Sequence, residues 1–268
     1  VGVQYNNGNN IIAGNTSGII TKAGPSPFTY AGAVSYTGGN NTISGFTSGS
    51  SNGSVGVYYY SGDNTITGNT VGISSTWHGV AYGGANVTVL GDTIGIQACT
   101  SGFGRGVGFG AGRVSIQGNI TGSSNSSSST GVSFGGGDIN ISGNVVGSSV
   151  GGSGVSFSMA NPPTPNSVRI FGNVFGSSAS GSGRGVQFTA GNTSIQGNVA
   201  ASAAGSSIGL YFNGGNTTII GNINATANNN VAISFNADPV FSTVLQGNIS
   251  GSSAGYSGIE FVQGQNTV

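Results

Sequence analysis

The fold is decided by a stretch that reads GVSFGGGDINISGNVVGSS, from Gly131 to Ser149. Within it Phe134 is followed seven residues later by Ile141, and a Gly-Asn pair begins two residues after that. Apolar and polar residues alternate around both Phe134 and Ile141, which is the two-residue period of a β-strand. Glycine, serine and asparagine, which favour turns, fill the gaps between these short runs. The stretch therefore predicts short strands joined by tight corners.

The same spacing between an aromatic and an aliphatic residue recurs along the chain. The other pairs at seven-residue spacing are Tyr5 and Ile12, Tyr36 and Ile43, Tyr59 and Ile66, Tyr82 and Val89, Phe109 and Ile116, Phe188 and Ile195, and Phe212 and Ile219. Two copies carry insertions, from Phe157 to Ile170 and from Phe235 to Leu245, and Phe261 begins one more. The aliphatic residue two positions before each aromatic recurs most often after about 23 residues, and the other steps are longer. A period in this range indicates a repeat architecture.

The repeat predicts an all-β fold, a single-stranded right-handed parallel β-helix, or β-solenoid. Three strands of about five residues and three corners make one coil of about 23 residues, so the chain holds about 10–11 coils. The crossover rule for parallel strands gives the right-handed sense. Coils stack about 4.8 Å apart, so the aromatic residues form one interior ladder. We expect residues 1–268 to form a single β-solenoid domain, either a segment of a longer rod or a stacking subunit.

Two further columns of the repeat carry specific expectations. Asparagine follows glycine at one corner of most coils, and stacked asparagine side chains can hydrogen-bond along the rod. Its members are Asn15, Asn69, Asn119, Asn144, Asn173, Asn198, Asn222 and Asn248. Arg113 and Asp138 both lie four residues after their aromatic, so we expect them to form an ion pair between adjacent coils. An exposed pair of this kind contributes about 0.2–1 kcal/mol.

Charge and hydropathy exclude several classes of partner. Only 4% of the residues are charged, with five basic and five acidic side chains and a net charge of zero. This balance argues against electrostatic binding to nucleic acid or to an anionic membrane surface. The chain has no apolar run as long as a membrane span, so we expect no membrane insertion. The regular apolar columns argue against disorder, although glycine, serine and asparagine are abundant.

Catalytic chemistry has few candidate residues in this sequence. The acidic residues are Asp63, Asp92, Asp138, Asp238 and Glu260. Acid–base catalysis requires two positioned groups. Asp63 and Asp138 share a column but lie three coils, about 14 Å, apart, which is too far for a glycosidase pair. His78, the single histidine, has no cysteine or carboxylate at ligand spacing. We therefore expect no catalytic residue, no metal site and no cofactor.

Binding is expected at exposed aromatic side chains and at the longer connections. Insertions in solenoids often project from one face and carry binding, which points to residues 22–31, 97–105 and 158–167. Aromatic rings can stack on sugars or enter pockets of a protein partner. The candidate binding residues are Tyr58, Tyr60, Trp77, Phe28, Tyr30 and Phe103. Tyr58 and Tyr60 flank Tyr59, so alternation along a strand should turn both of them outward.

The repeat from Gly131 to Ser149 resembles the repeats of large bacterial filamentous-haemagglutinin-like exoproteins, the two-partner-secretion and related β-helical adhesins. The likeness extends over the whole chain. It implies a secreted rod at the cell surface that holds binding loops away from a bacterium. No functional residue carries over from that family, because the repeat motif is structural.

These observations favour a non-catalytic structural or adhesive extracellular rod of a bacterial surface protein. Its expected partners are a glycan or protein on a host or neighbouring cell, or copies of itself. One alternative is a subunit of an extracellular filament that stacks end to end through open strand edges. Another alternative is a phage tail spike or a polysaccharide-processing β-helix.

Overall fold

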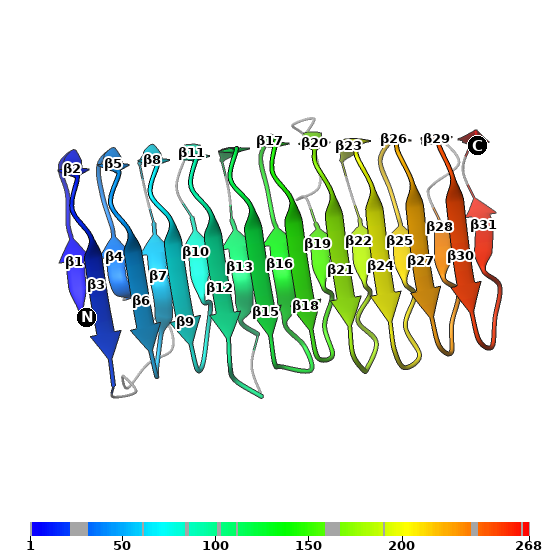
Figure 1. The fold of residues 1–268 in the computed structure, drawn as a ribbon, viewed down its shortest axis with the longest axis horizontal. Coiled ribbons are helices and arrows are strands. Elements are labelled where there is room, and N and C mark those ends of the chain that lie inside the picture. Colours follow the sequence, from blue (N-terminus) through cyan, green and yellow to red (C-terminus); the bar gives the residue numbers. More distant parts are fainter. Residues whose placement is uncertain are drawn as a thin grey trace.

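The computed structural model describes residues 2–21, 32–60, 62–83, 86–100, 103–110, 112–158, 167–189, 191–236, 241–263 and 265–267. Their regular secondary structure is entirely β-strand, arranged in three parallel sheets that run the length of a rod (Figure 1). In Figure 1 the chain rises through the rear sheet, crosses the top and descends through the front sheet while it advances to the right. The predicted right-handed parallel β-solenoid with three strands per coil is therefore confirmed.

Each sheet takes one strand from every coil. Sheet A, at the rear in Figure 1, contains β1 (Val3–Tyr5), β4 (Gly32–Tyr36), β7 (Val55–Tyr59), β10 (Val80–Tyr82), β13 (Arg105–Phe109), β16 (Thr130–Phe134), β19 (Val155–Phe157), β22 (Val186–Phe188), β25 (Leu210–Phe212), β28 (Ile233–Asn236) and β31 (Ile259–Gln263). Sheet B contains β2 (Asn10–Ile12), β5 (Asn41–Ile43), β8 (Asn64–Ile66), β11 (Asn86–Val89), β14 (Arg113–Ile116), β17 (Ile139–Ile141), β20 (Ser167–Phe171), β23 (Asn192–Gln196), β26 (Thr217–Ile220), β29 (Ser242–Gln246) and β32 (Gln265–Thr267). Sheet C, at the front, contains β3 (Thr16–Ile20), β6 (Thr47–Ser51), β9 (Thr70–Ser74), β12 (Thr93–Gln97), β15 (Ile120–Ser124), β18 (Val145–Ser149), β21 (Val174–Ser178), β24 (Val199–Ala203), β27 (Ile223–Ala227) and β30 (Ile249–Ser253).

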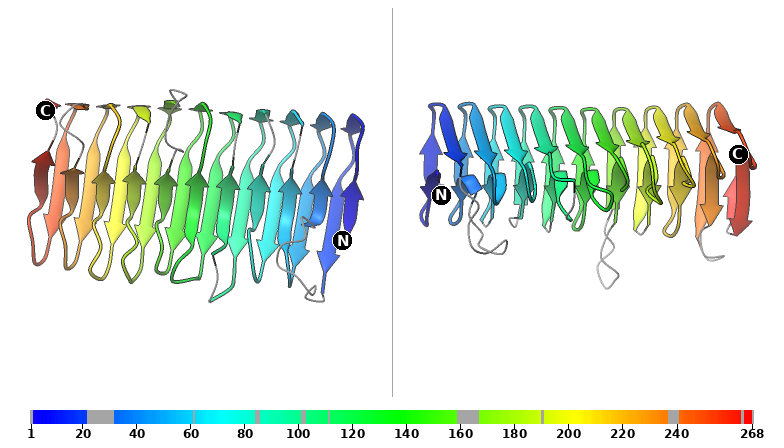
Figure 2. Two further views of the ribbon diagram at one scale, coloured as in Figure 1. Left: turned by 180° about the vertical axis from the view of Figure 1, so that it is seen from behind. Right: turned by 90° about the horizontal axis from the view of Figure 1, so that it is seen from below.

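The coil length differs slightly from the predicted value. The average coil has about 25 residues, because insertions lengthen some coils beyond the commonest step. The insertions lie in the connections and leave the sheets in register. Ile141 pairs with Ile170, for example, although the intervening coil is longer. The rear and underside views show the coils following one another along a straight axis, with the two chain ends at opposite ends of the rod (Figure 2).

The interior aromatic ladder is continuous from Tyr5 to Phe261. Successive rings are stacked with centroids 4.7–5.1 Å apart and planes within 9° of parallel. Phe109, Phe134 and Phe157 occupy neighbouring positions in this ladder and are almost completely buried. The ring spacing matches the distance between parallel strands, so the backbone register and the side-chain stack reinforce each other.

The aromatic ladder changes from tyrosine to phenylalanine along the rod, and the facing column of sheet C changes from threonine to aliphatic residues. In the N-terminal coils the buried hydroxyl of a tyrosine lies beside a threonine eleven residues later, at 3.2 Å for Tyr59 and Thr70 and 2.9 Å for Tyr82 and Thr93. From Phe109 onward the ring has no hydroxyl, and the facing residue of sheet C is aliphatic, beginning with Ile120 and including Val174 and Ile249 where an insertion changes the spacing. The core therefore becomes more apolar toward the C-terminus. The structure gives the reason, which is that each buried hydroxyl requires a partner.

Sheets A and C pack against each other through backbone rather than through large side chains. Gly147 of β18 faces Gly154, which precedes β19, and a methyl group added at Gly147 would overlap the carbonyl oxygen of Gly154. The same contact recurs in neighbouring coils, as between Gly122 and Gly131. Glycine is therefore required where the two sheets approach most closely.

The asparagine ladder at the corner between sheets B and C is present as predicted. The Oδ1 atom of Asn144 accepts two hydrogen bonds from Asn173, one from the backbone N–H at 3.1 Å and one from Nδ2 at 3.0 Å. The same double contact continues from Asn173 to Asn198 and then to Asn222. Asp92 occupies this column as well and accepts both bonds from Asn119. The column therefore satisfies backbone donors at a corner where they would otherwise lack partners.

Removal of one ring should show how much the aromatic ladder contributes. We expect Phe134→Ala to lower the free energy of unfolding by about 3–5 kcal/mol, because it removes a buried side chain that two neighbouring rings cannot replace. Phe103→Ala is the matched control, since Phe103 is 75% exposed and should cost little. Urea unfolding followed by circular dichroism measures both variants. Equal stability of the two variants would contradict a structural role for the ladder.

Alkaline pH should destabilise the N-terminal half of the rod. Burial raises the pKa of Tyr82 to about 12 and raises the pKa of Tyr59 well above 10. The neutral phenol is therefore favoured in the folded state. Its contribution is complete below about pH 10, the unfolded value, and is lost as the pH rises toward 12. The ultraviolet absorbance of phenolate should show Tyr59 and Tyr82 ionising above pH 10, together with loss of the fold. Ionisation of Tyr59 and Tyr82 near pH 10, with the fold intact, would contradict the buried hydroxyls.

Candidate functional site

The outer face of sheet A carries aromatic, amide and charged side chains. Alternation along each strand turns its central residue outward, and the register of the sheet places these residues in one line, the central column. Its members are Gln4, Ser35, Tyr58, Ala81, Gly108, Ser133, Ser156, Gln187, Tyr211, Ser234 and Glu260. The column contains both aromatic and polar side chains, while the two interior columns of this sheet are aliphatic and aromatic throughout. The outer face of sheet A is therefore the candidate functional site.

A second outward column, the edge column, consists of the residues three positions before those of the central column. Its members include His78, Arg105, Thr130, Ser153 and Arg184. These residues reach the same face because the next position is a glycine that packs inward against sheet C, as Gly106 does against Ser123. A contact between the edge column and the central column confirms that both lie on the same face. Arg184 Nη1 donates a 2.8 Å hydrogen bond to Gln187 Oε1, three residues later.

Tyr58 and Tyr60 lie toward the N-terminal end of this face. Their ring centroids are 5.3 Å apart with the planes tilted by 45°, and Tyr60 is 37% exposed while Tyr58 is partly buried. A Cβ built on Gly83 would lie 3.6 Å from the Tyr58 hydroxyl, so the ring of Tyr58 extends across the next coil. The predicted outward placement of both tyrosines is confirmed, with buried Tyr59 between them.

Trp77 and Phe103 lie in successive turns between sheets C and A, at the opposite end of the strands from Tyr60. The ring of Trp77 is 5.0 Å from that of His78, and Phe103 is 75% exposed. The backbone N–H of Arg105 donates a 3.0 Å hydrogen bond to His78 Nδ1. Burial, together with the positive charge of Arg105, lowers the pKa of His78 to about 3, so the imidazole is neutral near neutral pH. The structure thus separates the predicted aromatics into two groups.

The C-terminal half of the face carries a cluster that sequence reasoning missed. The Arg184 guanidinium carbon lies 3.9 Å from the centroid of the Tyr211 ring, a cation–π contact. Gln187 Nε2 donates a 2.7 Å hydrogen bond to Ser156 Oγ, and Asn236 Nδ2 donates a 3.2 Å bond to the Tyr211 hydroxyl. The sequence carried one signal for this cluster, because Tyr211 occupies the same column as Tyr58.

Two of the predicted binding residues and parts of the predicted loops lie outside the described residues. Phe28 and Tyr30 belong to the connection 22–31, and most of the connection 158–167 is likewise not described. Within 97–105, the structure describes residues 97–100 and 103–105.

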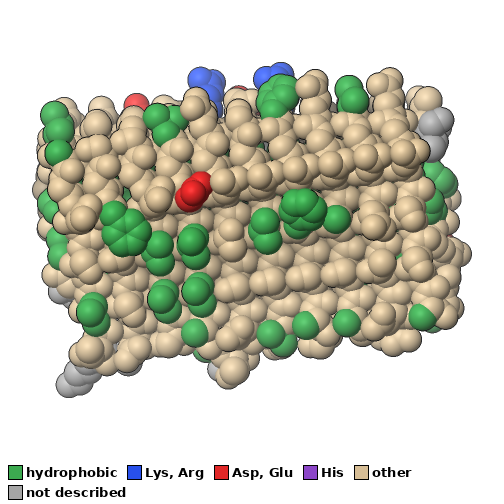
Figure 3. Space-filling model, in the orientation of Figure 1, with side chains coloured by type: hydrophobic (Ala, Val, Ile, Leu, Met, Phe, Trp, Pro, Cys, Tyr) green, Lys and Arg blue, Asp and Glu red, His purple; other side chains and the backbone are tan. Residues whose placement is uncertain are grey.

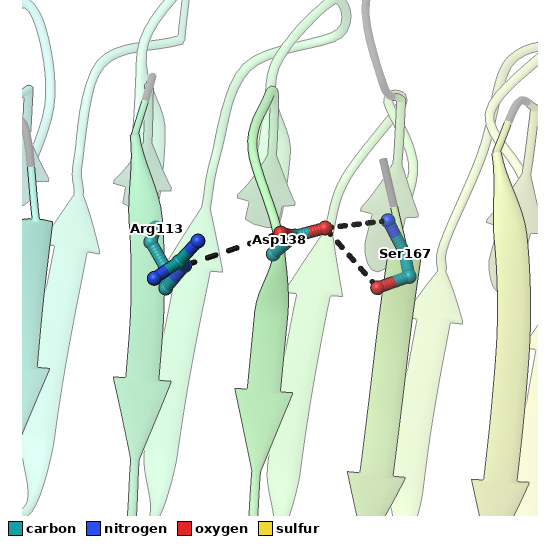
Figure 4. A network of polar contacts seen from close by, with 3 residues as sticks. All are labelled: Arg113, Asp138 and Ser167. Carbon is teal, nitrogen blue, oxygen red and sulfur yellow. Dashed lines mark hydrogen bonds and ion pairs between the residues drawn. The ribbon is translucent and has the colours of Figure 1, made fainter. Parts of the chain in front are cut away.

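Sheet B carries the predicted ion pair on its outer side. Arg113 Nε lies 3.9 Å from Asp138 Oδ2, and the other carboxylate oxygen of Asp138 accepts hydrogen bonds from the backbone N–H and the hydroxyl of Ser167 (Figure 4). The two ionic side chains are 71% and 41% exposed, so the pair contributes little to stability. Asp63 shares this column, three coils away, as predicted. Among the described residues, no group of three His, Cys, Asp or Glu side chains could hold a metal ion.

The outer face of sheet C offers a contrasting surface (Figure 3). Val146, Phe175 and Ala200 line a shallow hollow of about 350 Å³ together with serine and threonine side chains. The outward positions of its strands hold aliphatic, aromatic, amide and hydroxyl side chains and no charged residue. This face therefore lacks the charged groups found on sheet A. No helix in the described part of the chain is long and apolar enough to cross a membrane.

Acid should destabilise the turn that holds His78. The folded pKa of about 3 lies below the unfolded value of 6.5, so the stability contributed by neutral His78 is present above pH 6.5 and is lost as the pH falls toward 3. Because the chain has a single histidine, its imidazole resonances in an NMR titration report this pKa directly. His78→Gln should retain a hydrogen-bond acceptor for Arg105 and show a weaker pH dependence of unfolding. A midpoint near 6.5 in the folded protein would contradict the buried, neutral imidazole.

Comparison with known proteins adds no relative from which function could be transferred. No protein-family model matches the chain, and neither a curated protein nor a solved structure does. The parallel β-solenoid fold rests on the register of the three sheets, and a functional conclusion rests on the surface chemistry of this chain.

Proposed function

We propose that this protein is a non-catalytic, adhesive extracellular rod whose contacts are made by the outer face of sheet A. One observation carries the proposal: tyrosine rings lie beside hydrogen-bonding side chains on that face, at Tyr58 with Tyr60 and at Tyr211 with Arg184 and Gln187. An aromatic ring next to amide and guanidinium donors suits the apolar faces and hydroxyl groups of a sugar, or a polar segment of a protein partner.

Rigidity of the scaffold supports this role. The interior ladder and the sheet register fix the spacing of the outer side chains, so little conformational freedom remains to be lost on binding. A solenoid also extends in one direction, which separates a binding surface from the point of attachment. We also propose that the protein lies outside a bacterial cell, because its repeats resemble those of haemagglutinin-like exoproteins.

The distribution of acidic residues also supports a role without catalysis. Asp63 and Asp138 lie three coils apart, about 14 Å by the strand spacing, with Arg113 between them. Glycosidase carboxylates act across a much shorter gap. Asp92 holds backbone and side-chain donors of Asn119 at a structural corner. These placements disfavour the polysaccharide-processing alternative.

Glycan arrays and adhesion of the purified protein to cultured cells test the proposal. We expect the double variant Tyr58→Ala with Tyr211→Ala to weaken binding by about ten-fold or more, since buried aromatic contacts dominate such surfaces. Phe175→Ala is the matched control, because Phe175 is 41% exposed on sheet C. Unchanged adhesion of the tyrosine variant, or an equal loss in the control, would reject sheet A as the contact face.

The alternative of a filament subunit has its own readout. Electron microscopy of the purified protein should show isolated short rods if adhesion is the function. Long fibres that grow with protein concentration would favour end-to-end assembly instead.

A further inference from the structure

Two arginines on the outer face of sheet A have no carboxylate partner in the described part of the chain. Among the described residues, the structure has one ion pair, between Arg113 and Asp138 on sheet B. Arg105 and Arg184 have no acidic side chain within 4.0 Å in that part of the chain. Their charges are therefore available to an external anion.

Partial burial makes these two charges unusual. Arg105 lies along the sheet, because a Cβ built on Gly108 would meet its Cδ atom at 3.1 Å, and Arg184 lies over the Tyr211 ring. Burial lowers the pKa of both guanidinium groups, which means that desolvation disfavours the charge. Arg169 differs, since it is exposed on sheet B. An oxyanion bound at Arg105 or Arg184 would offset a desolvation cost that no carboxylate among the described residues compensates.

The two arginines are aligned along the rod. Both belong to the edge column, with Thr130 and Ser153 between them, so three coil steps of about 4.8 Å separate their backbones by about 14 Å. Alongside this interval the central column holds small residues, Gly108, Ser133 and Ser156. The face therefore holds two cationic points separated by small residues, of which Ser133 and Ser156 are only 5% and 4% exposed.

Among the described residues, the other ionisable groups on this face do not oppose an anion. His78, beside Arg105, is neutral because its pKa is about 3. Glu260 is the acidic member of the central column, and it lies three coils beyond Gln187. Tyr58 and Tyr211 lie beyond the small residues on either side, and Arg184 covers one face of the Tyr211 ring.

We propose that the outer face of sheet A binds an anionic polysaccharide that lies along the rod axis. Its acidic groups, carboxylate or sulfate, would pair with Arg105 and Arg184, and its sugar rings would contact Tyr58 and Tyr211. The coil repeat of about 4.8 Å is close to the length of one sugar in an extended chain, so the spacing suits a polymer. This inference rests on the proposed adhesive function and names its ligand class.

Binding to defined polymers by isothermal titration calorimetry tests this inference. The probes are polygalacturonate for carboxylates, dextran sulfate for sulfates and unmodified dextran as the neutral control. We expect wild-type protein to bind at least one anionic polymer, with affinity that falls as salt is added, and to ignore dextran. Arg105→Gln with Arg184→Gln should weaken anionic binding by about ten-fold or more. Preference between the two charged polymers identifies the acidic group.

Arg169→Gln with Arg113→Gln is the matched control, because it removes the same charge from sheet B. Retained affinity in this control supports a site on sheet A, and an equal loss in both double variants would overturn it in favour of non-specific charge attraction. Far-ultraviolet circular dichroism confirms that each variant keeps its strands. Absence of binding to both anionic polymers would also overturn the inference. The proposed function would survive that result if the tyrosine variants still lost adhesion to cells or neutral glycans.

Discussion

Every other feature of this protein depends on the stacking of each coil directly on the one before it. Parallel strands about 4.8 Å apart impose one translation on the whole chain, so a side chain meets its own counterpart above and below. Phe157 stacks on Phe134 after a short coil and Phe188 stacks on Phe157 after a longer one, with centroids 4.9 and 4.8 Å apart. The connections absorb the difference in length. The stack therefore constrains the strands and leaves the turns free to vary.

This translation explains which features could be predicted from the sequence. The aromatic ladder, the asparagine ladder and the pair Arg113 and Asp138 follow from column membership alone, because residues in one column become neighbours. The contact of Arg184 with Tyr211 could not be predicted, because it joins different columns and depends on how far a long side chain reaches. The inward turn at Gly106 also escaped the simple alternation of a strand, and it places Arg105 on the outer face.

Inside the N-terminal coils, each buried tyrosine hydroxyl lies beside a threonine hydroxyl on the facing strand. A buried tyrosine hydroxyl without a partner costs about 1–3 kcal/mol, so an isolated change from phenylalanine to tyrosine would be unfavourable. The chain avoids that cost by changing two columns together, as in Tyr82 with Thr93 and Phe109 with Ile120. This coupling is visible in the sequence at a spacing of eleven positions. The structure explains this coupling, because the two columns lie on facing walls of the same coil and their hydroxyl groups are close enough to hydrogen-bond.

The contrast between inner and outer columns is one reason why we propose that sheet A makes the contacts. Inner positions of that sheet repeat valine and then an aromatic residue, since each must fit the coil above and below. The central outer column instead passes through glycine, serine, glutamine and tyrosine within a few coils. Stacking imposes no common residue type there, because these side chains face away from the core. Arg105 and Arg184 also lie on this face, partly buried and without a carboxylate partner among the described residues, and for this reason we propose an anionic ligand there.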